Sequence, residues 1–196
     1  MRVAGTDDLD ALTAVITTAF SNDPVWGTYS FPQTHTRQEQ PARFWRAYLE
    51  MTLRFRWTLV SDGCEAAAVW IPPGEPELEA AHEAELAAVL ADELGARQAG
   101  LVLAAFAALD ADHPDDEPHH YLSLLGTHSD HRGRGIGMAL LDACLEAVDA
   151  ERSPAYLEST NPANDERYMR RGFTPRGRIE LAGGQIVTTM WRPART

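Results

Sequence analysis

Apolar positions in the first quarter of the chain recur every three or four residues in two segments. Residues 7–20 begin after Thr6, a residue that caps helices, and carry acidic side chains in the first turn. Residues of about 36–54 have the same period, and Phe44 and Tyr48 lie on the apolar side. The pattern predicts two helices, preceded by a short strand at residues 1–4 and joined by an aromatic-rich loop.

The next third of the chain changes from a strand pattern to a helical one. Residues 56–60 and 65–71 are apolar runs that flank a Ser-Asp-Gly turn, which predicts an antiparallel hairpin. Residues 76–112 are rich in Ala, Leu and Glu at helical spacing, with interruptions at Gly95 and Gly100. We therefore expect a helical insert of two or three helices at about 76–112.

The last third alternates between strands and helices. The pattern predicts a strand, a helix, a strand, a short helix and a final β region, at residues 121–127, 135–152, 155–160, 162–171, and 179–181 with 185–192. A strand–helix–strand unit places its two strands parallel. The fold class is therefore α/β, or α+β because of the antiparallel hairpin that precedes this unit.

The composition excludes several kinds of function. The sequence contains no lysine, so a Walker phosphate loop and a lysine Schiff base to pyridoxal phosphate are both excluded. The formal net charge is −12, and residues 1–120 carry 7 Arg against 20 Asp and Glu. Residues 121–196 carry 10 Arg against 9 acidic residues. No broad basic face emerges, so no nucleic-acid partner is expected, whereas the arginine-richer end suits a small polyanion.

Cysteine usage and hydropathy predict a cytoplasmic protein. Cys64 and Cys144 stand far apart without a CxxC motif, which favours two reduced thiols. The N-terminus is acidic and lacks the apolar core of a signal peptide. No uninterrupted apolar run approaches the ~20 residues that span a bilayer, so no membrane partner is expected.

A glycine-rich loop separates the predicted strand 121–127 from the helix that follows it. Gly133, Gly135 and Gly137 alternate with other residues there, Arg132 and Arg134 flank the first of them, and an amphipathic helix follows. Glycine lets the backbone approach a phosphate closely, and the free N–H groups of a helix start bind anions. A dinucleotide fingerprint GxGxxG fails, because Met138 or Leu140 occupies the sixth position. The loop predicts a phosphate site, with a tight surface turn as the alternative.

Other chemical motifs are weak or missing. His128 and His131, with Asp130 between them, lack a clear third metal ligand, and no HExxH motif occurs. There is also no G-x-S-x-G nucleophile elbow. We expect no metal and no covalent enzyme intermediate.

Two motifs carry a resemblance to a known family. Arg132-x-x-Gly135-x-Gly137 resembles the R/Q-x-x-G-x-G/A signature of the GNAT acyltransferase superfamily. The second motif of that superfamily is matched by a strand, the segment Asn161 to Tyr168, and Arg171-Gly172-Phe173. Together they cover residues 120–175. A looser similarity, to puromycin N-acetyltransferase and its relatives, rests on Ala68-Val69-Trp70-x-Pro72, the helical insert and His113-Pro114-x-x-Glu117-Pro118.

The resemblance implies an architecture and an activity. Residues 1–196 would form a single GNAT-like domain with a mixed central sheet of about seven strands, flanked by helices and splayed between strands 121–127 and 155–160. Acetyl-CoA would enter the splay, and its acetyl group would pass directly to a primary amine of a small molecule. A homodimer is common among such proteins. The identity of the amine and the preferred acyl-chain length stay open.

The resemblance also implies roles for individual residues. Tyr168 stands where the family places its general acid, with packing under the sheet as the alternative role. Pantetheine would contact the main chain at Leu125, Gly126 and Thr127, and the Leu125 N–H would stabilise the oxyanion. The diphosphate would lie on the phosphate loop, which consists of Arg132, Gly133, Arg134, Gly135, Ile136 and Gly137. Two asparagines, Asn161 and Asn164, would also contact the cofactor. Asn161 is also a suitable helix cap.

The general base is the least determined residue. Glu158, on the predicted strand after the cofactor helix, could accept the proton of the amine, or it could be a solvated or ion-paired strand carboxylate. His119 and His120 titrate in a useful range, and an ordered water chain is a further alternative. Trp26 and Tyr29, close to Asp23, are candidates for the wall of an acceptor cavity.

Two functions other than catalysis fit the same sequence. The domain could bind acyl-CoA as a non-catalytic sensor, or the acidic helical insert could be a protein-interaction module on a GNAT scaffold. Loss of turnover on removal of the Tyr168 hydroxyl, with the cofactor still bound, would separate an enzyme from a sensor.

Overall fold

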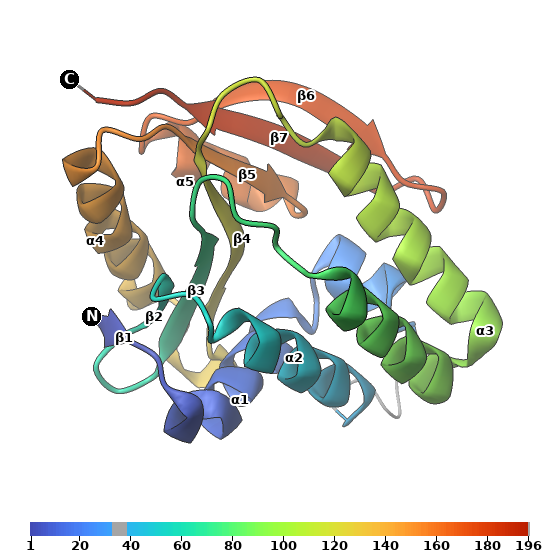
Figure 1. Cartoon of the computed structure of the whole chain (residues 1–196). Coiled ribbons are helices and arrows are strands. Elements are labelled where there is room, and N and C mark those ends of the chain that lie inside the picture. Colours follow the sequence, from blue (N-terminus) through green and yellow to red (C-terminus); the bar gives the residue numbers. More distant parts are fainter. Residues whose placement is uncertain (33–38, 196) are drawn as a thin grey trace.

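The protein is built on one seven-stranded mixed sheet with helices packed against both faces (Figure 1). The computed structural model describes residues 1–32 and 39–195. The strands are β1 (Arg2–Val3), β2 (Thr58–Val60), β3 (Ala66–Ile71), β4 (His120–Thr127), β5 (Ala155–Ser159), β6 (Thr174–Glu180) and β7 (Ile186–Arg192). Their spatial order is β1-β2-β3-β4-β5-β7-β6, and β4 and β5 are the parallel pair. The mixed sheet and the parallel pair confirm the predicted fold class.

Five helices accompany the sheet in the described part of the chain. They are α1 (Leu9–Phe20), α2 (Glu39–Thr52), α3 (Ala80–Asp112), α4 (Ile136–Ala150) and α5 (Asp165–Met169). In Figure 1, α4 covers one face of the sheet, whereas α1 and α2 lie against the other. The predicted start of the second helix at residues 36–38 lies outside the described residues.

Two apolar cores lie on opposite faces of the sheet, and β3 shows how the sequence divides between them. Ala67, Val69 and Ile71 point into the core beneath α1 and α2, whereas Ala68 and Trp70 point into the core beneath α4. All six residues of β3 are buried, because helices cover both sides of this strand. A continuous apolar run is the pattern expected of such a strand.

Three segments differ from their predicted structure. Residues 24–29, expected as a loop, form a π-helical turn, because the Asp23 carboxylate accepts hydrogen bonds from the N–H groups of Val25 (2.9 Å) and Trp26 (3.0 Å). The insert is one helical run bent at Gly95 (φ 75°), and Gly100 remains helical. The last hairpin begins at Thr174 and not at residue 179, because pairing with β7 extends past a register shift at Arg176.

Helix α3 is the one described helix that is long and apolar enough to cross a membrane by length and composition. Gly95 divides it into two shorter segments, and Leu86, Leu90 and Val102 are buried within the protein. Figure 1 shows α3 extending from the end of β6 and β7 toward α2. It therefore forms one wall of the space between the sheet and α2.

The central strands separate after a short stretch of pairing. Strand β5 pairs with β4 only at residues 155–157, opposite 120–122, although β4 continues to Thr127. At the point of separation, Ser123 has no partner on β3, since Val69 pairs with Leu124 and Trp70 with Leu122. A β-bulge of this kind bends a strand and increases its twist. The splay lies between the two strands for which it was predicted.

Candidate active site

The glycine loop that follows β4 has the open backbone that an anion site requires. Gly133 and Gly135 both adopt φ 78°, a left-handed conformation that costs other residues about 1 kcal/mol or more. A Cβ atom added at either glycine would meet no other atom within 4 Å. Their role is therefore to shape the backbone and to leave its outer surface accessible.

The backbone N–H groups of residues 133–138 have no hydrogen-bond acceptor within the described protein. The first bond of α4 runs from the Ala139 N–H to the Gly135 carbonyl at 2.9 Å, so the preceding donors stay free. Six adjacent donors at the start of a fifteen-residue helix form a site for a polyanion, and the helix dipole adds to the attraction. The loop could thus hold a diphosphate.

Gly137 and Gly126 have a different role, since both allow close packing. A Cβ atom at Gly137 would lie 2.3 Å from Thr127 Oγ1, and one at Gly126 would lie 2.8 Å from the Ala19 side chain. These glycines bring the start of α4 close to the end of β4, and β4 close to α1. The loop geometry therefore depends on small residues in the scaffold beneath it.

We expect Gly137→Ala to destabilise the fold by about 1–3 kcal/mol, because the added methyl group overlaps the stiff side chain of Thr127. Urea unfolding measures this loss. In a Thr127→Ala background the nearest remaining atom is the Thr127 Cβ at 3.7 Å, and the same substitution should become neutral or stabilise by up to about 1 kcal/mol. Equal losses in both backgrounds would contradict this account.

The two arginines of the loop are placed differently. Arg132 Nη2 donates to the carbonyl oxygens of Thr18 (2.9 Å) and Ala19 (2.6 Å), so its guanidinium caps the C-terminal end of α1. Arg134 is exposed, and its nearest polar partner is His131 at 3.4 Å. Arg134 is therefore the guanidinium with freedom to reach an anion on the loop, whereas Arg132 already has protein partners.

The two asparagines of the second motif take part in local hydrogen bonds. Asn161 caps the turn before α5, and its side-chain oxygen accepts from the Ala163 N–H at 3.1 Å, so its predicted capping role is confirmed. Asn164 accepts from Arg167 Nη1 at 3.1 Å. Both side chains remain partly exposed. Their contact with a cofactor stays a prediction.

Tyr168 lies on α5 and packs edge-on against Phe173, with 6.1 Å between the ring centroids. Burial, and secondarily the nearby carboxylate of Asp23, raises the pKa of Tyr168 to about 12. Its hydroxyl has no hydrogen-bond partner among the described residues. A protonated phenol with an uncommitted hydroxyl is able to donate a proton to a ligand.

The edge of β4 that faces the splay is available for main-chain contacts. Beyond residue 122 this edge of the strand has lost β5 as a partner, whereas the other edge stays paired with β3. Leu125, Gly126 and Thr127 all lie in this stretch. A ligand in the splay could therefore add main-chain hydrogen bonds along it.

Glu158 points into a network of tyrosines at the end of β5. Its side chain is 4% exposed, and its two oxygens accept from the hydroxyls of Tyr121 (2.7 Å) and Tyr156 (3.1 Å). Nδ1 of His113 lies 3.9 Å from its Oε1 atom. Glu158 is thus a buried carboxylate, which contradicts the solvated alternative, whereas the ion-paired alternative stays open because His113 is close enough to pair with it when protonated.

The two histidines considered as bases point to different places. His119 Nδ1 lies 2.7 Å from the Glu117 carbonyl oxygen and so carries a proton, which leaves its Nε2 to accept from His113 Nε2 at 3.1 Å. His120 is fully buried beside Trp57 and Ser153. Burial lowers the pKa of His120 to about 4, so this histidine is neutral at pH 7 and lies outside the cavity described below.

Sequence reasoning missed Glu77, a second carboxylate near Glu158. Its Oε1 atom accepts hydrogen bonds from the hydroxyls of Ser123 (2.6 Å) and Tyr48. Burial raises the pKa of Glu77, and the charge of Glu158 adds to this effect. Glu77 lies in the segment between β3 and α3, where the sequence offers no periodicity that would mark a buried acid.

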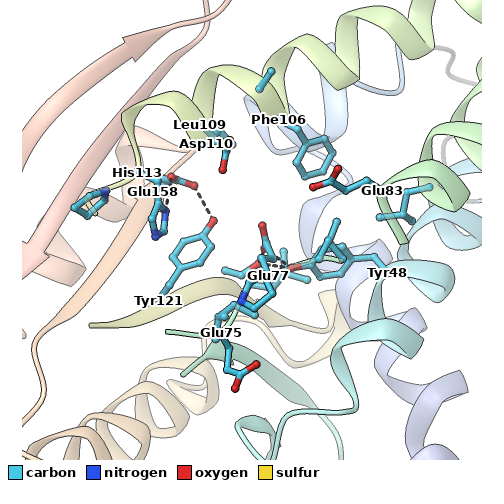
Figure 2. Close-up of a pocket in the computed structure, with 18 of the residues that line it drawn as sticks. Tyr48, Glu75, Glu77, Glu83, Phe106, Leu109, Asp110, His113, Tyr121 and Glu158 are labelled. Carbon is cyan, nitrogen blue, oxygen red and sulfur yellow. Dashed lines mark hydrogen bonds and ion pairs between the residues drawn. The ribbon is translucent and has the colours of Figure 1, made fainter. Parts of the chain in front are cut away.

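One cavity of about 730 Å³ lies between the sheet, α2 and α3, and the side chains of Glu77, Glu158 and Tyr121 are among those that line it. Figure 2 shows Glu158 and Glu77 on the sheet side, with Phe106, Leu109 and Asp110 of α3 opposite them. The volume falls within the range of about 300–1,000 Å³ of small-molecule sites. Trp26 lines this cavity, as the aromatic loop predicted, whereas Tyr29 does not.

The described residues contain no group of three or more His, Cys, Asp or Glu side chains that could hold a metal ion. His128 and His131 lie with ring centroids 5.9 Å apart beside the glycine loop. Cys64 and Cys144 are both free thiols.

Comparison with known proteins places the chain in a family. Residues 31–173 match the acetyltransferase (GNAT) family, and the protein belongs to it. The family uses acetyl-CoA as its cosubstrate, and this membership supports acyltransferase activity.

Solved structures resemble the whole chain. One from Corynebacterium glutamicum, described as histone acetyltransferase HPA2 and related acetyltransferase, is 25% identical with a TM-score of 0.67 over 99% of this chain and 95% of its own. Arylalkylamine N-acetyltransferase 2 from Aedes aegypti is 13% identical with a TM-score of 0.69 over 99% and 98%. An N-acetyltransferase from Staphylococcus aureus is 19% identical with a TM-score of 0.59 over 97% and 98%. The structures from Aedes aegypti and Staphylococcus aureus show that this chain shares their fold.

Proposed function

We propose that the protein is an N-acetyltransferase that moves the acetyl group of acetyl-CoA directly to a primary amine of a small molecule. The row of unpaired N–H groups at residues 133–138 carries this proposal, because it forms an anion site at one end of the splay. The cavity that contains Glu158 adjoins the paired end of the same two strands. A cofactor held along the splay would extend from the anion site at residues 133–138 toward the cavity that contains Glu158.

The described residues fit the polar groups of acetyl-CoA. The free N–H groups of residues 133–138, with Arg134, would hold the diphosphate. The uncovered edge of β4 at residues 125–127 would hold the pantetheine amides and direct an N–H toward the thioester carbonyl. Asn161 and Asn164 are partly exposed and could add side-chain contacts.

Two side chains would manage the protons of the reaction. Glu158 would accept the proton of the amine, so that the nitrogen lone pair can attack the thioester carbonyl. A main-chain N–H near Leu125 would stabilise the charge that develops on the carbonyl oxygen. As the C–N bond forms and the C–S bond breaks, Tyr168 would donate its proton to the departing sulfur, and the second proton that the nitrogen must lose would pass through water to the Tyr168 phenolate. The chain needs no nucleophile of its own for this direct transfer.

The kind of acceptor is supported by the cavity and by similarity. The dimensions of the cavity suit a small molecule, and the looser resemblance to puromycin N-acetyltransferase and its relatives also favours a small-molecule acceptor. Two structures of the same fold are described as arylalkylamine N-acetyltransferases or relatives of them. A protein substrate, which the Corynebacterium description suggests, would have to insert a side chain into this cavity.

We also propose a cytoplasmic location.

Thiol release from acetyl-CoA, measured against a panel of primary amines, tests the proposed activity. Because the chain contains no lysine, self-acetylation of lysine cannot contribute to the signal. Amine-dependent thiol release with formation of the N-acetyl product is the expected result. Hydrolysis that is independent of every amine would contradict the proposal.

Cofactor fragments test the role of the glycine loop. We expect acetyl-pantetheine, which lacks the diphosphate, to bind at least tenfold more weakly than acetyl-CoA, because it leaves the N–H groups of residues 133–138 unpaired. Arg134→Ala should weaken acetyl-CoA but not acetyl-pantetheine. Calorimetry gives both affinities, and Arg152→Ala, two residues beyond the far end of α4, is a matched control. Equal affinities for the two ligands would show that the loop does not bind the diphosphate.

A further inference from the structure

The chemistry of the cavity defines a narrower class of acceptor than a primary amine. Its walls combine a cluster of carboxylates with a large apolar surface. Seven carboxylates line it, namely those of Glu75, Glu77, Glu83, Asp110, Asp115, Glu117 and Glu158. No arginine is among the lining residues of the described chain, and the basic side chains among them are those of His113 and His119.

Of the two inner carboxylates, Glu158 has His113 as its one nearby basic side chain, at 3.9 Å, and Glu77 has none in ion-pair contact among the described residues. Glu77 and Glu158 receive hydrogen bonds from neutral hydroxyls, those of Tyr48, Tyr121 and Ser123 among them. Within the described residues, the side chain of Glu77 forms no ion pair. Neutral donors reduce the cost of burying a negative charge but do not cancel it. A ligand that brings a positive charge to this part of the cavity would supply the missing compensation.

The opposite wall of the cavity is largely apolar, and its two carboxylates, Glu83 and Asp110, are exposed. Helix α3 contributes Leu86, Leu90, Leu103, Phe106 and Leu109. Leu103 remains 37% exposed, which makes it one of the few large apolar side chains in the described structure that are not covered. An apolar surface left open inside a concave site is typical of ligand-binding sites. This wall would be covered by the uncharged body of a ligand.

We propose that this cavity is the acceptor site and that the acceptor is an amphipathic monoamine. Its single ammonium group would lie between Glu77 and Glu158, and an aromatic or branched apolar body would fill the space beneath α3. This inference rests on the proposed acetyl transfer for its chemistry, but the binding of the amine can be tested without turnover.

The arrangement gives the two carboxylates separate tasks. Glu77, held by Tyr48 and Ser123, would receive the ammonium group and position it, whereas Glu158 would take the proton that must leave before attack. Ser123 stands at the bulge where β4 leaves β5, so the positioning cluster lies at the entrance of the splay. Glu77 is therefore a specificity-determining residue that acts on the acceptor and not on the thioester.

The experiment compares three amines of similar basicity: phenethylamine, butylamine and the polyamine spermidine. Binding is measured by calorimetry in the presence of CoA, and kcat and KM are measured by thiol release. We expect phenethylamine to bind at least tenfold more tightly than either of the others. Phenethyl alcohol, which lacks the charge, should not compete with it.

Two variants test the two walls separately. Glu77→Gln should raise the Kd and KM for phenethylamine at least tenfold while changing kcat less than threefold, and Glu85→Gln, an exposed acid on α3 outside the cavity, is its control. Leu103→Asn should weaken phenethylamine but leave butylamine unchanged, because only the larger body reaches α3.

Stability provides a readout that separates binding from structure. Burial raises the pKa of Glu77 above its value of about 4.5 in the unfolded chain, so the folded state loses stability as pH rises from 4.5 through the raised value. The charged groups nearest to Glu77 are Glu158 and His113, and Tyr48 and Ser123 donate to it. Glu77→Gln should therefore keep or raise Tm at pH 8, whereas a purely structural carboxylate would lower it when replaced.

Each outcome has a distinct meaning. Tighter binding of spermidine or butylamine, or equal effects of Glu77→Gln and Glu85→Gln, would overturn the inference even if acetyl transfer occurs. Occupation of the cavity by the acyl chain of a long-chain acyl-CoA, with no binding of phenethylamine, would overturn the inference as well, since the cavity would then be an acyl-chain site. Binding of phenethylamine without any transfer would uphold the acceptor site and contradict the proposed function.

Discussion

Replacement of Tyr168 with phenylalanine should lower kcat by about 10²–10³ while leaving the affinity for acetyl-CoA within about threefold. The ring would keep its edge-on contact with Phe173, so the fold should be preserved. The loss arises because the departing thiolate would no longer receive a proton. Steady-state kinetics and calorimetry on the same preparation measure the two quantities.

The pKa of Tyr168 adds a condition to this prediction. Since burial raises it to about 12, the hydroxyl stays protonated throughout the range from pH 6 to 10, and the variant should be impaired by the same factor across it. Neither Tyr168 nor Tyr29 lines the cavity, and Tyr29→Phe, which removes a hydroxyl outside both GNAT motifs, serves as the control. Unchanged turnover in Tyr168→Phe would remove the proposed general acid. A wild-type protein that binds acetyl-CoA without turnover would instead be a sensor.

Replacement of Glu158 with glutamine should lower kcat/KM by about 10²–10³ at pH 7 for an alkylamine, again with little change in acetyl-CoA affinity. An amide has nearly the same shape as the carboxylate, and it can both accept from and donate to the hydroxyls of Tyr121 and Tyr156. The network would persist, but the group that removes the proton from the ammonium would be lost. Glu146→Gln, at an exposed position on α4, is the matched control.

The basicity of the acceptor separates a general base from a positioning residue. An amine that is already neutral at pH 7, such as an alkoxyamine, needs no deprotonation before attack, so the defect of Glu158→Gln should shrink by about tenfold or more with it. An equal defect for basic and weakly basic amines would mean that Glu158 only orients the substrate. The base would then be sought in a water chain or in His113, which lies 3.9 Å from Glu158.

The phosphate loop and the order of strands and helices around it could be predicted from sequence because their causes are local. Gly133 and Gly135 can adopt the positive φ of a tight turn without steric cost, and an apolar period of 3.6 after them begins a helix. A strand on each side of that helix then pairs in parallel. The capping role of Asn161 was predicted for the same reason, since a cap bonds to residues two or three positions away.

The cavity and its pair of carboxylates could not be predicted, because they join residues that are distant in the sequence. Glu77, Tyr48 and Ser123 come from three segments and meet only after α2, β4 and the segment before α3 have packed. The role of Arg132 also depended on packing, since the carbonyl groups that it binds belong to the end of α1. Asp23 capped a π-helical turn where the same breaker residues had indicated a loop.

The sequence by itself therefore determined the kind of fold, the loop that could hold an anion, and the family. Each of these depends on backbone conformation and periodicity over a few consecutive residues. The tertiary structure decided which carboxylates are buried together, which arginine is already bound, and how large and how apolar the acceptor site is. These properties depend on the distances between segments and on the removal of water from between them, and no short stretch of sequence contains that information.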